Sequence, residues 1–372
     1  ATYGYSGNVD QKKSAVTTLR YIGTDQYTNL PYNIVSQFEN PDLRWEKVKM
    51  INVGIDFKMK DNIINGSLEY YRKRGVDLFG DAPVDYTSGV GMPSLMKNVA
   101  SMKGQGVDLN TNFDILRKKV FWTFSLSLNY NISEVSKYYL SSTNGSTYIS
   151  NGSIITPIEG KPVFSVLSYR WAGLDDKGNP QGIVDGKPST DYTTITGAGT
   201  QVDDLKYNGP AMPPVYGSLT NTFKWKEFSV IVAVDYKLGH YFRRKSINYG
   251  QLFLGNLGQA DYAQRWKQPG DERRTNVPSM IYPNIKERDV FYNASEILVE
   301  KADNIRLQYI DLSYTLPNRV SEQFHFQNAA FYVSLANIGI IWKADKHGID
   351  PDYAGALFPP SKSISVGFKT NF

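Results

Sequence analysis

The last residues of the chain, 361–372, alternate between two kinds of side chain. Apolar or neutral residues occupy every second position, ending with Phe368, Thr370 and Phe372, and small or polar residues lie between them. Successive side chains of a β-strand point to opposite faces of a sheet, so this segment predicts a strand with one apolar and one polar face. A strand at a sheet edge needs a partner, and closing the sheet into a barrel supplies one.

The same alternation recurs along the whole chain. We expect about eleven strands, most of them ten or more residues long, whereas strands of soluble proteins average about five or six. The expected segments are 1–7, 14–27, 46–59, 64–71, 107–113, 120–130, 215–225, 228–239, 304–316, 327–338 and 361–372. In 304–316 the apolar phase slips between Tyr309 and Ile310, which predicts a β-bulge or the exit of the strand from a membrane.

The connections between these segments alternate between short and long. The short ones are expected near 8–13, 60–62, 114–119, 226–227 and 317–326, and the others are far longer, including about thirty residues before Val107. Transmembrane β-barrels have short turns on one side of the membrane and long loops on the other. The pattern therefore predicts an all-β transmembrane antiparallel barrel, with every short turn on the side of the C-terminus.

Composition excludes several other classes of protein. The mean hydropathy is −0.39, and no segment approaches the roughly 18 apolar residues of a membrane-spanning helix. A barrel remains compatible, because only half of each strand faces lipid. The chain has no cysteine, which excludes disulfides and cysteine metal sites. A net charge of +5 is mild and predicts no nucleic-acid partner, although it suits anionic surfaces.

Catalytic and cofactor motifs are lacking in the sequence. The three histidines are scattered without ligand spacing, so we expect no metal site, no cofactor and no enzymatic activity: His240, His325 and His347. Segment 175–179 is interpreted as a glycine-containing turn, because it lacks the spacing of a calcium loop. Asp203–Asp204 and Asp350 with Asp352 could act as acid–base pairs, but solvated loop carboxylates are commoner.

Candidate binding residues lie in the long loops. Seven aromatic side chains there are candidates for substrate contact, with packing inside the loops as the alternative: Trp171, Tyr241, Tyr249, Tyr262, Trp266, Tyr282 and Tyr353. A basic cluster at the expected outer rim could contact lipopolysaccharide phosphates or an acidic substrate, or be solvated: Arg243, Arg244 and Lys245. Aromatic residues at strand ends are typical of interfacial girdles: Trp45, Tyr70, Trp122 and Trp225.

Several segments, in order along nearly the whole chain, resemble the C-terminal half of SusC/RagA-type TonB-dependent outer-membrane transporters. They are 3–8, 40–46, 66–71, 98–109, 265–271, 306–317 and 349–351. A terminal phenylalanine is also how bacterial outer-membrane barrels commonly end. On this resemblance Phe368 and Phe372 belong to the signal for barrel assembly.

The resemblance implies a 22-stranded barrel closed by a plug, of which residues 1–372 would form the C-terminal half without plug or first-half strands. It implies import of an oligosaccharide or peptide across the outer membrane of a Gram-negative, Bacteroidetes-like cell. A SusD-like lipoprotein would capture the ligand, TonB would act through the missing N-terminal part, and transporter–lipoprotein pairs could dimerise. A cell-surface carbohydrate-binding or adhesion β protein and a barrel-embedded enzyme remain the alternatives.

Overall fold

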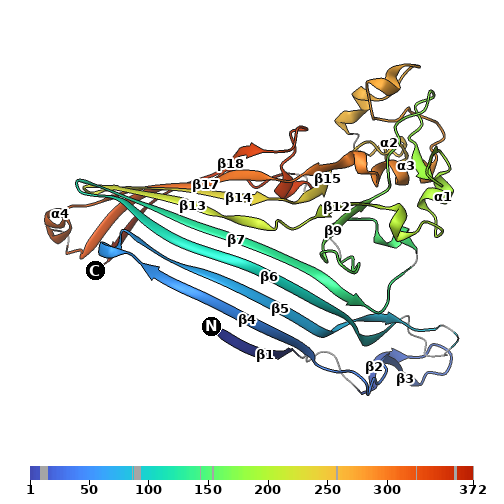
Figure 1. Cartoon of the computed structure of the whole chain (residues 1–372), viewed down its shortest axis with the longest axis horizontal. Coiled ribbons are helices and arrows are strands. Elements are labelled where there is room, and N and C mark those ends of the chain that lie inside the picture. The colour runs from blue at the N-terminus through green and yellow to red at the C-terminus, as the bar shows by residue number, and fades with distance from the viewer. Residues whose placement is uncertain are drawn as a thin grey trace.

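The computed structural model describes residues 1–8, 16–85, 87, 94–142, 144–152, 155–256, 259–323, 325–355 and 358–371. Its main feature is a long, ten-stranded antiparallel sheet whose strands follow one another in sequence order (Figure 1). The strands are β1 (Thr2–Asn8), β4 (Glu46–Lys58), β5 (Ile64–Pro83), β6 (Ser94–Arg117), β7 (Val120–Tyr138), β13 (Val215–Trp225), β14 (Phe228–Leu238), β17 (Asn304–Thr315), β18 (Asn328–Lys343) and β19 (Ser363–Asn371). The expected all-β architecture is confirmed, and the described sheet is open, with β1 and β19 at its edges.

The segment expected as a second barrel strand, 14–27, does not join this sheet. Its described part forms β2 (Thr18–Thr24), which pairs with β3 (Pro31–Gln37) in a separate hairpin. Strand β1 pairs directly with β4, with Asn8 opposite Glu46. The expected hairpin between 1–7 and 14–27 is therefore wrong, and the described sheet has ten strands rather than eleven. The turn expected at 8–13 lies, beyond Asn8, outside the described residues. Alternation reveals that a segment is a strand, but not which strand it pairs with.

The loop before Val107 is shorter than the roughly thirty residues predicted for it. Strands β5 and β6 stay paired as far as Pro83 and Ser94, which leaves residues 84–93 as the connection. Glycine and proline in this stretch suggested a loop, but the ladder continues through register shifts between Gly75 and Phe79. The other short turns lie where expected, at one end of the sheet, and α4 (Asn318–Gln323) lies in the last of them (Figure 1).

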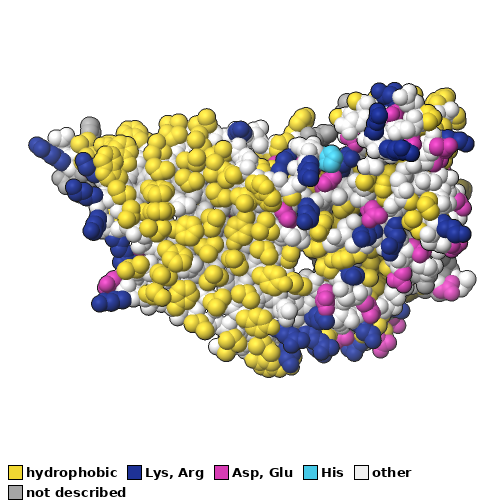
Figure 2. Space-filling view, turned by 45° about the horizontal axis from the view of Figure 1, so that its top comes forward, with side chains coloured by type: hydrophobic (Ala, Val, Ile, Leu, Met, Phe, Trp, Pro, Cys, Tyr) yellow, Lys and Arg dark blue, Asp and Glu magenta, His cyan; other side chains and the backbone are white. Residues whose placement is uncertain are grey.

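One face of the sheet, here called the apolar face, collects large hydrophobic side chains from all ten strands (Figure 2). Cross-strand pairing aligns them in rows, for example Phe368, Phe331, Tyr314, Phe228 and Trp225. Many are exposed despite their size, including Val366 at 76% and Ile364 at 73%. An exposed apolar area of this extent is far larger than a soluble monomer carries and indicates contact with lipid.

The opposite face, here called the polar face, has the complementary rows. One row crosses six strands through Asp56, Ser67, Asn110, Ser127, Ser218 and Asp235. The bulge expected in the strand from Asn304 is confirmed, because the pairing of β17 with both of its neighbours skips Gln308. In a closed barrel such a polar face lines the lumen.

The height of the apolar face matches a membrane. On β7 every second residue from Val120 to Ile132 is apolar, a path of about 40 Å along the strand. At a strand tilt of about 40° this spans roughly 30 Å, compared with an apolar band of about 25 Å on outer-membrane barrels. Towards the short turns the band ends in aromatic pairs, such as Trp122 stacked on Phe223 with ring centroids 5.3 Å apart.

The hydrophobic core lies in the long loops rather than in the sheet. Loops 139–214 and 239–303 pack together at one end of the sheet, and we call them the loop body (Figure 1). It contains β8 (Ser150–Asn151), β9 (Ser165–Ser168), β10 (Gly182–Val184), β11 (Lys187–Ser189), β12 (Lys206–Pro210), β15 (Tyr241–Arg243), β16 (Val299–Lys301), α1 (Tyr192–Thr196), α2 (Tyr249–Phe253) and α3 (Lys286–Asn293). No helix in the described part of the chain is long and apolar enough to cross a membrane.

Candidate functional site

A cavity of about 870 Å³ lies where the loop body meets the sheet. One wall comes from β7, β13 and β14, through Asn131, Ser133, Tyr216 and Lys237 on the polar face. The other wall comes from the loop body and is mainly apolar: Ile155, Pro162, Val163, Phe164, Tyr207, Pro210, Met212 and Pro213. A mostly apolar cavity of this size, with a few polar groups, is typical of a small-molecule or peptide site. Its lining comes from separate segments, so sequence motifs could not reveal it.

An ion-pair network borders this cavity. Lys237 Nζ lies 2.9 Å from Asp352 Oδ1, and Arg306 Nη2 lies 2.6 Å from Asp350 Oδ1 and 3.3 Å from Asp352 Oδ2. The guanidinium of Arg306 also lies 5.5 Å from the ring centroid of Tyr353. These contacts fasten the 344–362 loop to β14 and β17. Asp350 and Asp352 thus each lie beside a cation and act as ion-pair partners that hold this loop in place.

Three of the seven candidate aromatics lie in the packing of the loop body. Tyr249 is 1% exposed and donates a hydrogen bond to the Pro278 carbonyl at 2.6 Å. Trp171 packs between the two buried clusters of the loop body. Trp266 lies on Gly178, where an added Cβ would come 2.5 Å from the indole.

Three further candidates lie nearer the surface. The half-buried Tyr241 ring covers Gly209, and Tyr262 lies under the Arg265 guanidinium, 4.0 Å from the ring centroid. Tyr282 is 80% exposed and meets Phe253 edge to face at 5.2 Å. None of the seven is among the described residues lining the 870 Å³ cavity, so Tyr282 is the one that a partner could reach most directly.

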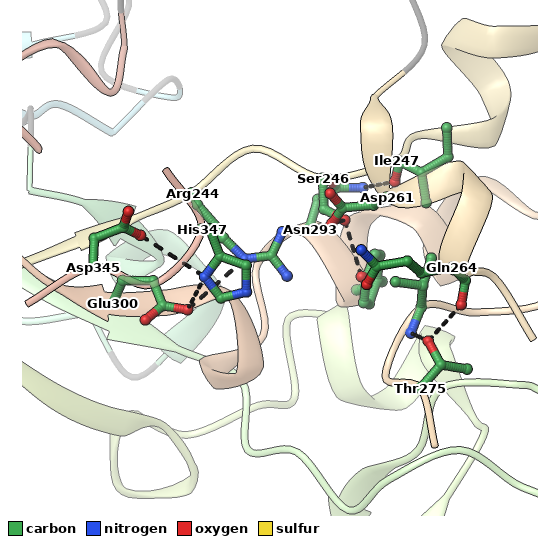
Figure 3. Close-up of polar contacts among 12 residues, drawn as sticks. Arg244, Ser246, Ile247, Asp261, Gln264, Thr275, Asn293, Glu300, Asp345 and His347 are labelled. Carbon is green, nitrogen blue, oxygen red and sulfur yellow. Dashed lines mark hydrogen bonds and ion pairs between the residues drawn. The ribbon is translucent and has the colours of Figure 1, made fainter. Parts of the chain in front are cut away.

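The three residues of the basic cluster differ in their burial and in their partners. Arg243 donates to the carbonyls of Leu167 and Ser150, and burial lowers its pKa to about 10. Arg244 pairs with Asp261, with Nη1 2.5 Å from Oδ2 (Figure 3). Burial would raise the pKa of Asp261, but hydrogen bonds from Ser246 and Arg244 lower it below its ordinary value. Lys245 is the exposed member of the cluster.

The structure also places residues from the remaining sequence expectations. Asp175 accepts hydrogen bonds from the amides of Lys177 and Asn179, which confirms the turn at 175–179. Asp203 and Asp204 are exposed in a short 3₁₀ turn. Phe368 lies on the apolar face, with its ring centroid 4.8 Å from that of Phe331. Phe372 lies outside the described residues.

Comparison with known proteins decides the family. The sequence model described as "TonB dependent receptor-like, beta-barrel" matches residues 3–270. The chain belongs to the TonB-dependent receptor β-barrel family. This membership accounts for an apolar face directed to lipid and a polar face directed to a lumen.

The relatives of this TonB-dependent receptor β-barrel include the group expected from the sequence. TonB-dependent receptor P3 of Formosa agariphila is 23% identical, over 95% of this chain and 35% of its own length. TonB-dependent receptor SusC of Bacteroides thetaiotaomicron is 20% identical over the same shares. The structure of the RagAB peptide transporter matches with a TM-score of 0.77 at 24% identity, covering 100% of this chain and 40% of that one.

These matches confirm the resemblance to SusC/RagA-type receptors. The chain spans about 35–40% of the length of these relatives. The open edges at β1 and β19 agree with a sheet that is only part of such a receptor barrel.

Proposed function

We propose that residues 1–372 form part of the wall of a TonB-dependent importer of nutrients in the outer membrane of a Bacteroidetes-like bacterium. The observation that carries this proposal is the inverted distribution of apolar residues. Large hydrophobic side chains are exposed across ten strands, whereas the buried core lies in the loop body. A soluble carbohydrate-binding protein would bury the face of its sheet instead.

Substrate would reach the polar face from the end that carries the loop body, through the 870 Å³ cavity. The lining combines many apolar side chains with the cation Lys237, whereas Glu134 is held by Lys103, 2.5 Å away on the apolar face. A peptide has apolar side chains and anionic groups, so this lining favours a peptide over an oligosaccharide. The RagAB relative, which is a peptide transporter, supports the same choice. The role is transport and not catalysis.

A SusD-like lipoprotein would dock on the loop body. The end of α2 and the segment before α3, which meet through Phe253 and Tyr282, carry four exposed apolar side chains, here called the apolar cluster: Leu254, Met280, Tyr282 and Ile285, with exposed fractions from 45% to 80%. A protein partner covers such a cluster more readily than a hydrophilic ligand does. TonB would act through parts of the receptor outside residues 1–372, and transporter–lipoprotein pairs could dimerise, as the resemblance implies.

A basic stripe supports the same orientation in the membrane. Lys49, Arg74 and Lys103 lie opposite one another on β4, β5 and β6, on the apolar face just beyond the hydrophobic band, with Arg72 in the adjoining row. Like charges placed directly opposite destabilise a sheet unless anions lie between them. Glu134 on β7, 2.5 Å from Lys103, supplies one such anion, and lipopolysaccharide phosphates would supply the others at the outer surface.

Purification from the native outer membrane in mild detergent, followed by mass spectrometry, tests the function. We expect the chain in the membrane fraction, together with a lipoprotein and a heterogeneous pool of peptides. An oligosaccharide pool would retain the importer and overturn the peptide assignment. Recovery of the chain in the soluble fraction without a partner would overturn the importer itself.

A further inference from the structure

Three side chains from two segments that are distant in sequence converge at the junction of the loop body and the 344–362 loop (Figure 3). Glu300 comes from β16, whereas Asp345 and His347 follow β18. One potential ligand atom from each lies within 4.8 Å of the other two. The spacing in the sequence predicted no metal site, because these residues meet only through the packing of two loops.

The distances suit coordination. His347 Nδ1 lies 3.1 Å from Glu300 Oε1 and 3.8 Å from Asp345 Oδ1. Nitrogen and oxygen ligands about 2.1 Å from a tetrahedral Zn²⁺ lie roughly 3.4 Å apart. The distances of 3.1 and 3.8 Å lie on either side of that value, so a single ion could contact all three atoms after small side-chain shifts.

Asp345 supplies an independent indication of a missing partner. Its side chain is 0% exposed, and Oδ2 accepts from the amide of Ile349 at 2.8 Å and lies 3.4 Å from Lys343 Nζ. Its other oxygen, Oδ1, is buried, points towards His347 and has no hydrogen-bond partner among the described residues (Figure 3). A buried carboxylate oxygen without a partner is costly, and a cation would satisfy it.

The charged side chains around the three potential ligands have a net charge that favours binding of a cation. Three carboxylates, on Asp261, Glu300 and Asp345, face two cationic side chains, Arg244 and Lys343. Arg244 is bonded to Asp261 through Nη1, and its Nε lies 3.9 Å from Glu300, too far for a hydrogen bond. These five side chains together therefore carry one excess negative charge.

We propose that Glu300, Asp345 and His347 bind a divalent first-row transition-metal ion, with Zn²⁺ as the best match. Imidazole and carboxylate together suit Zn²⁺, whereas Ca²⁺ requires six to eight oxygen ligands. His347 is 46% exposed, so a fourth position is open to water. The ion would fasten the 344–362 loop to β16, beside the network of Arg306, Asp350 and Asp352.

The experiment uses the full-length receptor, purified in detergent, stripped with a chelator and titrated with Zn²⁺ by calorimetry. Co²⁺ serves as a second probe, because its visible absorption reports tetrahedral coordination. We expect His347→Asn and Glu300→Gln each to remove one equivalent of bound Zn²⁺ or weaken it at least about tenfold. His325→Asn is the matched control, because His325 is exposed at the opposite end of the sheet and should change nothing.

Proteolysis gives a readout that does not depend on other metal sites in the receptor. Zn²⁺ should slow cleavage in the 344–362 loop of the wild-type receptor and of His325→Asn, but not of His347→Asn. A wild-type receptor that takes up no Zn²⁺ would overturn the proposal, and so would equal Zn²⁺ binding by His347→Asn. In that case the direct contact of His347 with Glu300 holds the cluster together without a metal. Heat-modifiable migration on gels verifies that each variant barrel is folded.

Discussion

The indole of Trp171 stacks on the ring of Phe291, with centroids 6.2 Å apart and planes 11° from parallel. Trp171 comes from the 139–214 loop, and Phe291 comes from α3 in the 239–303 loop. The indole also packs against both buried clusters of the loop body. A residue considered for substrate contact from the sequence therefore links the two long loops.

Replacement of Trp171 with alanine should loosen the loop body and leave the sheet intact. Loss of a half-buried indole should cost about 2–3 kcal/mol of local stability, somewhat less than for a fully buried one. Hydrogen exchange should become faster in α3 and unchanged in β13 and β14. Trp45→Ala is the control, because Trp45 is 65% exposed and outside the loop body. Equal exchange in α3 of both variants would contradict this role.

Gly217 is a position where the sheet has no room for a side chain. A Cβ there would come 2.0 Å from the carbonyl oxygen of Ser127 on β7 and 2.5 Å from the hydroxyl of Tyr236. The first contact is backbone, so Gly217→Ala must push β13 away from β7, at a cost of about 2 kcal/mol or more.

We expect a lower yield of folded barrel for Gly217→Ala, measured by heat-modifiable migration after membrane extraction. Gly4→Ala is the matched control, since a Cβ at Gly4 meets nothing within 4 Å. If the two variants assemble equally well, β7 and β13 do not approach each other as closely as described.

His240 should make the outer end of the sheet sensitive to acid. Burial lowers its pKa below the ordinary value, against the opposing influence of Asp303, whose Oδ1 lies 4.0 Å from Nδ1. The unfolded chain therefore takes up a proton near pH 6.5, before the folded chain does. Stability is present above pH 6.5 and falls as the pH drops from there towards the folded pKa.

Thermal unfolding measured between pH 7.5 and 5.5 checks this linkage. The melting temperature of the wild-type receptor should fall over this interval, and His240→Gln should reduce the fall. His325→Gln is the control: it also removes one histidine, and it should retain the full fall in melting temperature. An unchanged slope in His240→Gln would assign the acid sensitivity to other groups.

The apolar and polar faces of the sheet could be predicted from the sequence, because the alternation along each strand depends only on which of its sides faces lipid. The bulge at Gln308 could be predicted as well, since an extra residue shifts the alternation of apolar residues between Tyr309 and Ile310. The sequence could not reveal that β1 pairs with β4, because the partner of a strand depends on the register of the whole sheet.

The binding candidates were harder to predict for a different reason. Whether an aromatic side chain in a loop is buried depends on contacts between distant loops, as Tyr249 and the exposed Tyr282 illustrate. The same holds for Glu300 and His347, which meet only after both loops have folded. Residue type alone does not distinguish a side chain that packs inside the loops from one that binds a ligand.

Tyr282 should contribute to capture of the lipoprotein partner. It is the most exposed residue of the apolar cluster on the loop body, and aromatic side chains at interface centres often contribute 2 kcal/mol or more, about a thirtyfold change in affinity. Tyr282→Ser should reduce the lipoprotein that co-purifies from the outer membrane. Tyr27→Ser is the control, because Tyr27 is 93% exposed on the segment between β2 and β3. Equal recovery of the lipoprotein with both variants would place the partner elsewhere.

Arg72 and Arg74 should hold lipopolysaccharide at the edge of the hydrophobic band. With Lys49 they line a hollow of about 180 Å³ directly beyond Ile51, where lipid-facing residues end and charged ones begin. Phosphate groups are bound strongly by arginine, and this binding weakens as salt screens the charges. The double variant Arg72→Gln/Arg74→Gln should therefore lose lipopolysaccharide at a lower salt concentration than the wild-type receptor during washing in detergent. Lys187→Gln/Lys206→Gln removes the same charge from the exposed surface of the loop body and should retain it. If both double variants release lipopolysaccharide alike, net charge and not the basic stripe is responsible.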